Sequence, residues 1–283
     1  MKYYSPLRYP GGKGKITSYM KEIIKKNSLV GGIYVEPYAG GAAVAISLLL
    51  DEYVDKIIIN DIDYSIYAFW YSMINKTKEL CQLIEKTPIT ITEWKKQKKI
   101  QSIKNCDLLT LGFSTLFLNR TNRSGILKNA GPIGGFEQKG KWKLNVRYSK
   151  SDIIERIKRI SLYKNRIEIY NYDAIELIKT INKSLPSNTL IYFDPPYYMK
   201  GKELYFNYYR RKNHEEISNK IKKINKHRWI VTYDNVASIR KLYKLYRKKK
   251  FLLNYSAGRS NRGEEVMIFS NNINVVGRRI LDR

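Results

Sequence analysis

A short apolar and aromatic run that stops at two prolines is the feature that most constrains the fold of this chain. Residues 189–193, Thr-Leu-Ile-Tyr-Phe, have the composition of a strand buried on both faces. Asp194, Pro195 and Pro196 follow, and because neither proline has a backbone N–H, the strand cannot continue directly into a helix. The pattern predicts a stiff loop at the carboxyl end of a central strand, the edge where open α/β sheets bind ligands.

This loop carries the groups needed to hold a planar ring with an exocyclic amino group. The Asp194 carboxylate and the Pro195 carbonyl can accept both amino hydrogens, and the ring of Tyr197 or Tyr198 can stack on the ligand. A rigid turn without chemistry is the alternative for an isolated tetrapeptide. The sequence Asp-Pro-Pro-Tyr resembles the catalytic motif of the amino-directed DNA methyltransferases. The resemblance implies a catalytic role for four residues: Asp194, Pro195, Pro196 and Tyr197.

The charge of the whole chain points to a polyanionic partner. Its 283 residues include 53 Lys and Arg against 25 Asp and Glu, a formal net charge of +28. Such a balance favours nucleic acid, since phosphate contacts dominate its binding. The alternative is a lysine-rich composition that reflects a biased proteome, with the excess on solvated surfaces.

Cysteine and histidine usage points away from metal and disulfide chemistry. The two cysteines, Cys81 and Cys106, match neither a metal-ligand spacing nor a disulfide framework, and two histidines add little. We therefore expect no metal site and a reducing cytoplasmic location. The sequence shows no signal-peptide pattern and no apolar run long enough to span a membrane, so we expect no membrane association.

The amino-terminal region contains Arg-Tyr-Pro-Gly-Gly-Lys at residues 8–13. Its glycines allow close approach of a ligand to the backbone, and its lysine can neutralise a carboxylate. A surface turn is the alternative. The segment resembles the aromatic-Gly-Gly-Lys motif of the Dam-like methyltransferases, although Tyr9 stands where that family often has tryptophan. The resemblance implies that Tyr9 and Lys13 contact S-adenosylmethionine.

Residues 33–42 combine a predicted strand, a glycine-rich turn and the start of a helix. The turn is not the dinucleotide fingerprint, because no third glycine follows at the required offset. It resembles the methyltransferase cofactor loop Glu-Pro-aromatic-x-Gly-x-Gly, with Ala42 in place of the last glycine, from which we expect a shifted loop. A generic strand-to-helix turn is the alternative. The resemblance implies cofactor contacts by five residues: Glu36, Pro37, Tyr38, Gly40 and Gly41.

Two acids follow further predicted strands. Asp61 lies about twenty residues beyond the glycine loop, the spacing that places a carboxylate on ribose hydroxyls. Asp63 could do this instead, or Asp61 could cap the helix that follows. Asp173 follows a predicted strand at residues 166–170. The resemblance implies that Asp173 contacts the adenine amino group of the cofactor, with a helix cap as an equal alternative, and that Asp194 also lies at the cofactor.

Between residues 64 and 150 the strand pattern gives way to four helical stretches at 65–74, 77–85, 92–103 and 107–118. A loop-rich segment follows, with a hairpin expected near Gly140. Arginine and asparagine on loops suit base edges and phosphates, although ordinary turn and capping roles are the alternative. The segment resembles the target-recognition insertion of Dam-like enzymes. That resemblance implies DNA contacts by six residues: Arg120, Asn122, Arg123, Lys141, Trp142 and Lys143.

The motifs occur in the order of the α group of the Dam-like, D12-class DNA adenine methyltransferases, and the resemblance covers almost the whole chain. It implies an α/β fold: a doubly wound, mostly parallel, seven-stranded Rossmann-like sheet whose last strand is antiparallel. Residues 1–64 and 151–283 are expected to form the catalytic domain, and residues 65–150 the target-recognition insertion.

The resemblance also implies the reaction. A methyl group passes directly from S-adenosylmethionine to the exocyclic amino group of adenine in double-stranded DNA, after base flipping and without a metal. An RNA adenine methyltransferase and a DNA-binding relative without catalysis are the alternatives. We expect a monomer, with a cognate restriction endonuclease as a further partner if the chain serves a restriction–modification system. The sequence does not reveal the recognition site.

Overall fold

The central feature of the fold is a seven-stranded sheet with the strand order β3-β2-β1-β4-β5-β7-β6. The computed structural model describes residues 4–8, 13–127, 129–198, 211–255 and 261–281, with backbone alone for 254–255 and 261–262. The strands are β1 (Gly32–Glu36), β2 (Val54–Asn60), β3 (Ile167–Tyr170), β4 (Thr189–Phe193), β5 (Arg228–Asp234), β6 (Arg247–Tyr255) and β7 (Asn261–Phe269). Strands β1 to β5 pair in parallel, whereas β7 is antiparallel to both β5 and β6. The predicted mostly parallel, doubly wound sheet is confirmed.

The sheet order reverses between β1 and β4. The chain moves outward from β1 to β2 and β3, then returns to the other side of β1 to form β4 and β5. The register pairs Tyr34 with Leu190 and Val35 with Ile191, so β1 and β4 end side by side. Ligands of open α/β sheets bind at this kind of switch point, outside the carboxyl ends of the strands.

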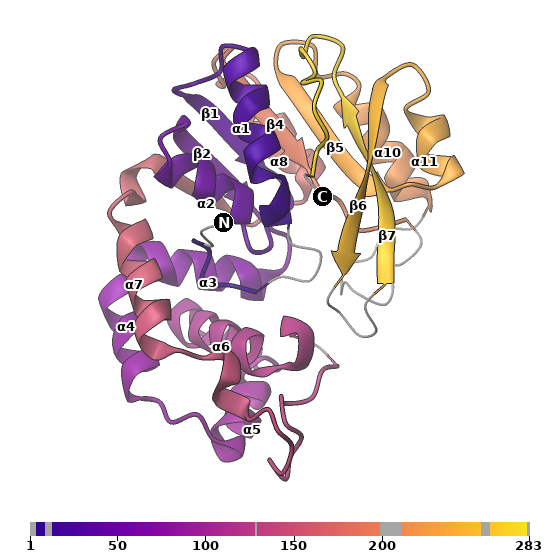
Figure 1. Cartoon of the computed structure of the whole chain (residues 1–283). Helices are drawn as coiled ribbons and strands as arrows, with labels where there is room; N and C mark the ends of the chain where they lie inside the picture. The colour runs from indigo at the N-terminus through magenta and orange to yellow at the C-terminus, as the bar shows by residue number, and fades with distance from the viewer. Residues whose placement is uncertain (1–3, 9–12, 128, 199–210, 256–260, 282–283) are drawn as a thin grey trace.

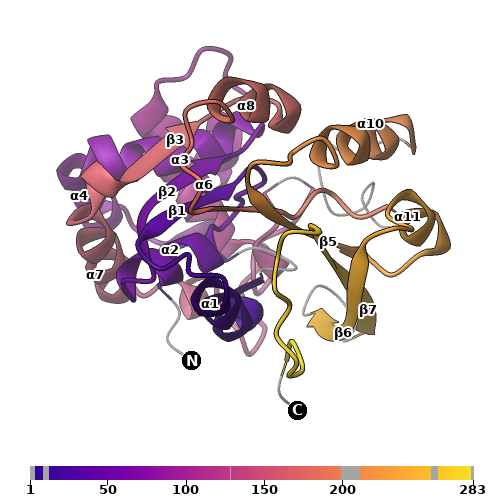
Figure 2. The same cartoon turned by 90° about the horizontal axis from the view of Figure 1, so that it is seen from above.

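Helices cover both faces of the sheet (Figures 1 and 2). On one face, α1 (Thr17–Lys26) and α2 (Ala43–Leu50) pack in a single apolar cluster with Tyr34 and Ile57 of the sheet. On the other face, α8 (Ala174–Ile181), α10 (Arg211–Ile221) and α11 (Ala237–Leu242) pack in a second cluster. The α2 sequence, Ala-Val-Ala-Ile-Ser-Leu-Leu-Leu, is apolar all round, as a helix enclosed on all sides requires.

The predicted insertion forms a separate helical layer beyond one end of the sheet (Figure 1). It comprises α3 (Tyr64–Asn75), α4 (Thr77–Lys86), α5 (Ile91–Ile100) and α6 (Leu108–Thr121), and α7 (Lys150–Ser161) returns the chain to the sheet. The four predicted helical stretches are confirmed. The core of the first sheet face continues into this layer through Phe69 and Phe117, which belong to the same apolar cluster as Ile57. The boundaries at 65 and 150 stay predictions.

The hairpin expected near Gly140 is wrong. Residues 133–149 contain no strand, and a single side chain, Gln138, organises this segment. Its amide donates to the carbonyls of Ile133 and Gly135 at 2.7 and 2.5 Å, and its Oε1 accepts from the Leu144 backbone N–H at 2.8 Å. Gln138 thus satisfies backbone groups that a hairpin would have paired with one another. A short 3₁₀ turn at Arg123–Gly125 precedes the segment, and a second one at Leu144–Arg147 lies within it.

The described part of the chain contains no helix that combines the length and the apolar character needed to cross a bilayer. Within the same residues there is no group of three or more His, Cys, Asp or Glu side chains arranged to hold a metal ion.

Candidate active site

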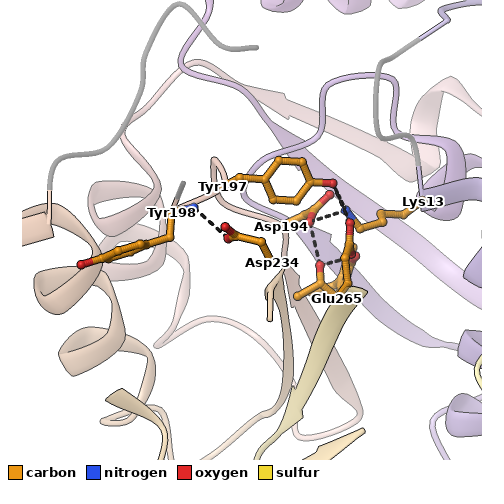
Figure 3. A network of polar contacts seen from close by, with 8 residues as sticks. Lys13, Asp194, Tyr197, Tyr198, Asp234 and Glu265 are labelled. Carbon is orange, nitrogen blue, oxygen red and sulfur yellow. Dashed lines mark hydrogen bonds and ion pairs between the residues drawn. The ribbon is translucent and has the colours of Figure 1, made fainter. Parts of the chain in front are cut away.

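Four side chains from three distant segments converge beside the carboxyl end of β4. Figure 3 shows Lys13, Asp194, Tyr197 and Glu265 pointing toward one another, with Asp234 and the Tyr198 backbone on the other side of the loop. Lys13 begins a 3₁₀ helix, Lys13–Ile16, Asp194 directly follows β4, and Glu265 lies within β7. The sheet order therefore brings together residues that are far apart in sequence.

Lys13 is the cation at the centre of this group. Its Nζ lies 2.9 Å from Asp194 Oδ1 and 3.4 Å from Glu265 Oε2, and it donates to the Tyr197 hydroxyl at 3.2 Å. Burial alone would lower the pKa of Lys13, but the two carboxylates more than compensate and hold that pKa well above its usual value. Lys13 therefore stays an ammonium ion throughout the physiological pH range.

The two oxygens of Asp194 have different surroundings. Oδ1 lies against Lys13 and accepts from the Thr232 hydroxyl at 2.6 Å, and Thr232 is in turn 2.7 Å from the Tyr192 hydroxyl. Oδ2 has no hydrogen-bond partner among the described residues. The carboxylate is thus anchored through one oxygen and presents the other as an acceptor. The Pro195 carbonyl, the second predicted acceptor, likewise accepts no hydrogen bond from these residues.

The two tyrosines of the loop are held in different ways. Tyr197 is buried, and its hydroxyl donates to Glu265 Oε1 at 2.6 Å, so its ring is fixed beside Asp194. The backbone N–H of Tyr198 donates to Asp234 Oδ1 at 2.8 Å, and the Tyr198 ring lies 5.0 Å from the ring of His214 on α10. Of the two rings, Tyr197 is the one whose position is set by the same polar group as the Asp194 carboxylate.

Glu36 ends β1 beneath the glycine-rich turn. It is buried, and its Oε1 accepts from the Tyr34 hydroxyl at 3.1 Å and from the Ala45 backbone N–H at 3.2 Å. Burial, reinforced by the nearby Asp194 charge, raises the pKa of Glu36 to about 8. Its hydrogen bonds join β1 to the first turn of α2. Glu36 therefore helps to hold the predicted cofactor loop, which connects β1 to α2, in its conformation.

The loop itself, with Pro37, Tyr38, Gly40 and Gly41, lies at the switch point of the sheet, as expected for a cofactor loop. Gly40 and Ala42 both adopt left-handed backbone angles, with φ of 47° and 44°. Such angles are easy for glycine and costly for alanine. Trp70 of α3 donates from Nε1 to the Gly40 carbonyl at 2.9 Å, which ties the loop to the insertion.

Asp61, the predicted ribose ligand, lies against the same loop. Its Oδ2 accepts from the Gly40 backbone N–H at 2.8 Å, and its Oδ1 accepts from the Asp63 backbone N–H at 2.9 Å. Burial raises the pKa of Asp61 to about 7, even though the Asp63 hydrogen bond opposes this shift. Asp63, not Asp61, caps α3, because it accepts from the Ser65 backbone N–H at 2.9 Å. The capping alternative for Asp61 is thereby removed.

Asp173 caps α8, since its Oδ1 accepts from the Ile175 backbone N–H at 2.8 Å. A contact with adenine stays a prediction. Asn60, which belongs to no motif of the sequence, organises this end of the sheet: its amide donates to the carbonyls of Pro37 and Tyr172, each at 2.9 Å. Asn60 thus joins the loops that follow three neighbouring strands. Tyr9 lies outside the described residues.

A family model for the D12 class of N6 adenine-specific DNA methyltransferases matches residues 9–255. This chain belongs to that family. It is therefore an S-adenosylmethionine-dependent, DNA adenine-specific methyltransferase, and the predictions of family, enzyme class and cofactor are confirmed.

Individual relatives are distant. The chain is 24% identical over 221 residues to the type II methyltransferase M.MjaIII of Methanocaldococcus jannaschii, an alignment that covers 72% of this chain and 73% of the relative. Among solved structures, a putative RNA methyltransferase of Pyrococcus horikoshii covers 90% of this chain and 83% of its own, at 9% identity and a TM-score of 0.42. The rRNA methyltransferase aviRa of Streptomyces viridochromogenes covers 92% and 85%, at 10% identity and a TM-score of 0.41. At these TM-scores the structural likeness supports no assignment of substrate.

The residues at the sheet edge fit S-adenosylmethionine. Asp61 is an acid whose pKa is raised by burial without a cation among its described neighbours, so it suits hydroxyl donors such as those of a ribose. Ile62 and Tyr172, which come next in sequence to Asp61 and Asn171, are 47% and 38% exposed and offer apolar surface for a purine. Beside β4, the excess negative charge of Asp194 and Glu265 over Lys13 suits a sulfonium ion.

The predicted DNA-binding residues divide into two groups. Arg123, Lys141, Trp142 and Lys143 have exposed side chains. Arg120 and Asn122 do not, and the prediction that they lie on the DNA-binding surface is wrong in this structure. Arg120 donates from Nε to the Pro6 carbonyl at 2.7 Å, and burial lowers its pKa to about 10. Asn122 accepts from Trp94 Nε1 at 2.7 Å and donates to the Ile126 carbonyl at 2.7 Å. Both side chains therefore form hydrogen bonds in the interior of the protein.

Sequence reasoning missed three residues near the site. Glu265 and Thr232 lie inside strands and carry no local motif. Arg8 is partly buried next to the glycine segment, and its Nη1 has no hydrogen-bond partner among the described residues. Burial, together with the nearby Arg147, lowers the pKa of Arg8. Two guanidinium groups that repel each other at the mouth of the site would both gain from an anion.

Proposed function

We propose that this protein flips an adenine out of double-stranded DNA at a specific sequence and methylates its N6 atom in the site beside β4. The observation that carries the proposal is the geometry of Asp194, which is anchored through Oδ1 while its Oδ2 and the carbonyl of the next residue, Pro195, accept no hydrogen bond from the described residues. Two acceptors on one stiff loop match the two hydrogens of an amino group. A stacked base hides its reacting face inside the duplex, so the adenine must leave the stack.

The residues of the site then divide the work. Asp194 and the Pro195 carbonyl accept the two N6 hydrogens, which leaves the nitrogen lone pair available for attack. S-adenosylmethionine supplies the methyl group as an electrophilic sulfonium, so that one N–C bond forms as one S–C bond breaks. The methylated nitrogen then loses one proton, for which Asp194 Oδ2 is an available acceptor. Positioning and electrostatics account for the rate, and the enzyme forms no covalent intermediate.

Tyr197 supplies the wall on which the flipped base stacks. Its ring is fixed at its hydroxyl end by Lys13 and Glu265, so it does not need to be ordered when the base enters. A pre-ordered aromatic surface lowers the entropic cost of binding the base. The Pro195–Pro196 pair keeps the loop stiff for the same reason.

The DNA lies across the space between the sheet edge and the insertion. The candidates are the four exposed insertion side chains Arg123, Lys141, Trp142 and Lys143, the exposed α5 lysines Lys95 and Lys99, and the pair formed by the partly buried Arg8 and the exposed Arg147. Base-edge contacts from loop arginines set the sequence, whereas the α5 lysines contribute attraction to phosphate. We further propose that the protein acts as a monomer, and that a cognate endonuclease exists if it protects DNA as type II methyltransferases do.

The decisive experiment is methyl transfer to matched duplex DNA and RNA substrates. We expect radioactive methyl groups from S-adenosylmethionine to appear as N6-methyladenine in duplex DNA at one sequence motif. The RNA duplex serves as the control for the alternative substrate, and the Asp194→Asn variant as the control for contaminating activity. Methylation of RNA in preference to DNA would reverse the substrate assignment.

Specificity and general affinity are separable within the insertion. Arg123→Ala should relax the methylated motif at one position, because a bidentate contact to a base contributes ~1–3 kcal/mol of discrimination. Lys95→Glu with Lys99→Glu should weaken binding to all sequences and reduce the salt slope, without changing the motif. Sequencing of methylated sites in a random library, together with binding at several salt concentrations, measures both. An unchanged motif for Arg123→Ala and an altered one for the lysine variant would show that the two roles are reversed.

A further inference from the structure

Glu265 is a buried carboxylate that lies in the interior of the sheet. It is fully buried in β7, where it pairs with Asp234 of β5 on one side and with Phe251 of β6 on the other. Burying an ionised carboxylate costs several kcal/mol unless partners compensate it. A chain that needed only a stable strand would use an apolar residue here, as β7 does at Val266 and Met267. Packing alone therefore does not explain why a carboxylate occupies position 265.

Two partners of Glu265 are residues of the methylation site. Its Oε1 accepts from the Tyr197 hydroxyl at 2.6 Å, and its Oε2 lies 3.4 Å from Lys13 Nζ. One carboxylate thus reaches the proposed stacking ring and the cation that anchors Asp194. Figure 3 shows this arrangement, with Lys13 between the two acids.

Charge balance gives this arrangement a chemical consequence. One ammonium ion faces two carboxylates, so the group carries one excess negative charge. Without Glu265, Lys13 would neutralise Asp194 alone, and Asp194 would become a weaker acceptor for the amino hydrogens. With Glu265 present, the positive charge is shared, and Asp194 keeps its acceptor strength while remaining anchored.

We propose that Glu265 is a positioning residue of the methyl-transfer site, which fixes the Tyr197 ring and shares Lys13 with Asp194. This inference rests on the proposed function. Glu265 acts through Tyr197 and Lys13 and does not itself touch the base. Its loss should therefore slow the chemical step far more than it weakens the binding of cofactor or DNA.

The test uses an isosteric change with a matched control on the neighbouring residue. Glu265→Gln keeps the shape of the side chain and an acceptor for Tyr197, but removes the charge. Glu264→Gln makes the same change one residue away, on an exposed side chain that pairs with Asn235 and Lys250. The full-length variants are compared in single-turnover methyl transfer to duplex DNA, in affinity for S-adenosylhomocysteine and for DNA, and in thermal unfolding.

For Glu265→Gln we expect the single-turnover rate to fall between 10- and 100-fold, which corresponds to ~1.4–2.7 kcal/mol. Both affinities should stay within about threefold of wild type, because binding groups are unchanged. Glu264→Gln should match wild type throughout. A Glu265→Gln rate within about threefold of wild type would overturn the inference and leave the proposed function standing, whereas an inactive wild-type protein would overturn both.

A second variant keeps the inference testable if Glu265→Gln folds poorly. Tyr197→Phe retains the ring and removes the hydroxyl that Glu265 holds, without leaving a buried charge unpaired, since Lys13 remains beside Glu265. We expect its methyl-transfer rate to fall between 3- and 10-fold. Where both single variants fold, adding Tyr197→Phe to Glu265→Gln should slow the reaction by less than Tyr197→Phe slows the wild type, because a neutral glutamine holds the Tyr197 hydroxyl more weakly than a carboxylate does. A fully active Tyr197→Phe, or fully additive losses in the double variant, would contradict the proposed link.

Discussion

The two halves of the sheet edge compensate their acids in opposite ways. Beside β4, β5 and β7, Asp194 and Glu265 share the ammonium group of Lys13, whose pKa is raised well above its usual value. Beside β1 and β2, Glu36 and Asp61 are held by neutral donors, and burial raises their pKa values to about 8 and about 7. One side of the site therefore compensates its acids with a shared ammonium ion, whereas the other side compensates them with neutral donors.

This difference matches the division of labour that we propose. The β4 side must present a charged acceptor to an amino group and a negative field to a sulfonium ion. The β1–β2 side must accept hydroxyl groups and hold a loop in shape, for which a full charge is not needed. Variants that change the charge on one side should therefore leave the other side largely intact.

The largest effect is expected when the charged acceptor itself is removed. Asp194→Ala should lower the rate of methyl transfer by at least about 1,000-fold, which corresponds to ~4 kcal/mol. The fold should survive, because Lys13 keeps Glu265 as its counter-ion. Single-turnover kinetics and circular dichroism measure the two expectations. Activity within tenfold of wild type would remove Asp194 from the catalytic role.

Removal of the shared cation tests the comparison directly. Lys13→Met leaves Asp194 and Glu265 facing each other across a site without compensation, and breaking a buried ion pair from one side costs roughly 3–5 kcal/mol. We expect a comparable loss in the free energy of unfolding, measured in urea, together with weaker binding of cofactor. Adding Glu265→Gln to Lys13→Met should restore part of the lost stability, because it removes one of the two carboxylates that had shared the Lys13 ammonium group. No recovery in the double variant would show that the loss comes from packing.

The neutral side should respond to pH where the charged side does not. The folded-state pKa of Glu36, about 8, lies above the usual pKa of 4.5 for a glutamate, so the folded protein binds this proton more tightly than the unfolded chain. Its contribution to stability is therefore present below pH 4.5 and is lost as pH rises through about 8. Glu36→Gln keeps the shape without the proton, and should reduce the fall in unfolding free energy between pH 5 and 8.5 by on the order of 2–4 kcal/mol.

Urea unfolding at several pH values, in the absence of cofactor, measures this difference. Asp61 still titrates in the variant, with a pKa of about 7, so a smaller pH dependence of the same sign should remain. Glu52→Gln is a suitable control, because Glu52 is exposed and its carboxylate faces Arg166. Identical pH profiles for wild type and Glu36→Gln would show that Glu36 is ionised in the folded protein.

The same comparison separates what the sequence could and could not predict. Asp194, Lys13, Glu36 and Asp61 were found because each follows a strand or a glycine segment in a fixed local pattern. Glu265 was not found, because its role depends on β7 lying antiparallel beside β5, a pairing between distant segments. Local sequence patterns thus predict which side chains lie at the end of a strand. The charged residues that contact those side chains from other strands become known only from the strand pairing of the folded sheet.

In the insertion the error is the opposite one, because residues predicted to contact a ligand have a structural role. Arg120 and Asn122 lie in a polar run that resembles a DNA-contacting loop, yet Arg120 falls in the last turn of α6 and faces the Pro6 carbonyl. Helix α6 continues to Thr121, three residues beyond its predicted end at residue 118. A polar side chain at a helix end can serve the interior as well as a ligand, and composition does not distinguish the two. The prediction of a hairpin near Gly140 failed for a similar reason. The Gln138 side chain binds the backbone groups that two paired strands would otherwise have bound in each other.

The smallest expected effect concerns Ala42, the one departure from the family's glycine pattern. Ala42 has a φ of 44° and directly precedes α2, and its N–H donates to the Ala39 carbonyl at 2.6 Å. A left-handed backbone costs a non-glycine residue about 1–2 kcal/mol, whereas glycine adds ~0.4–1 kcal/mol of unfolded-state entropy. Ala42→Gly should therefore stabilise the protein by about 0.5–1 kcal/mol, measured by urea unfolding. Ala45→Gly, inside α2, is the matched control and should destabilise it, because helix interiors disfavour glycine. If Ala42→Gly is the more damaging of the two, the methyl group at 42 contributes packing that outweighs the strain, and the turn is shaped around alanine.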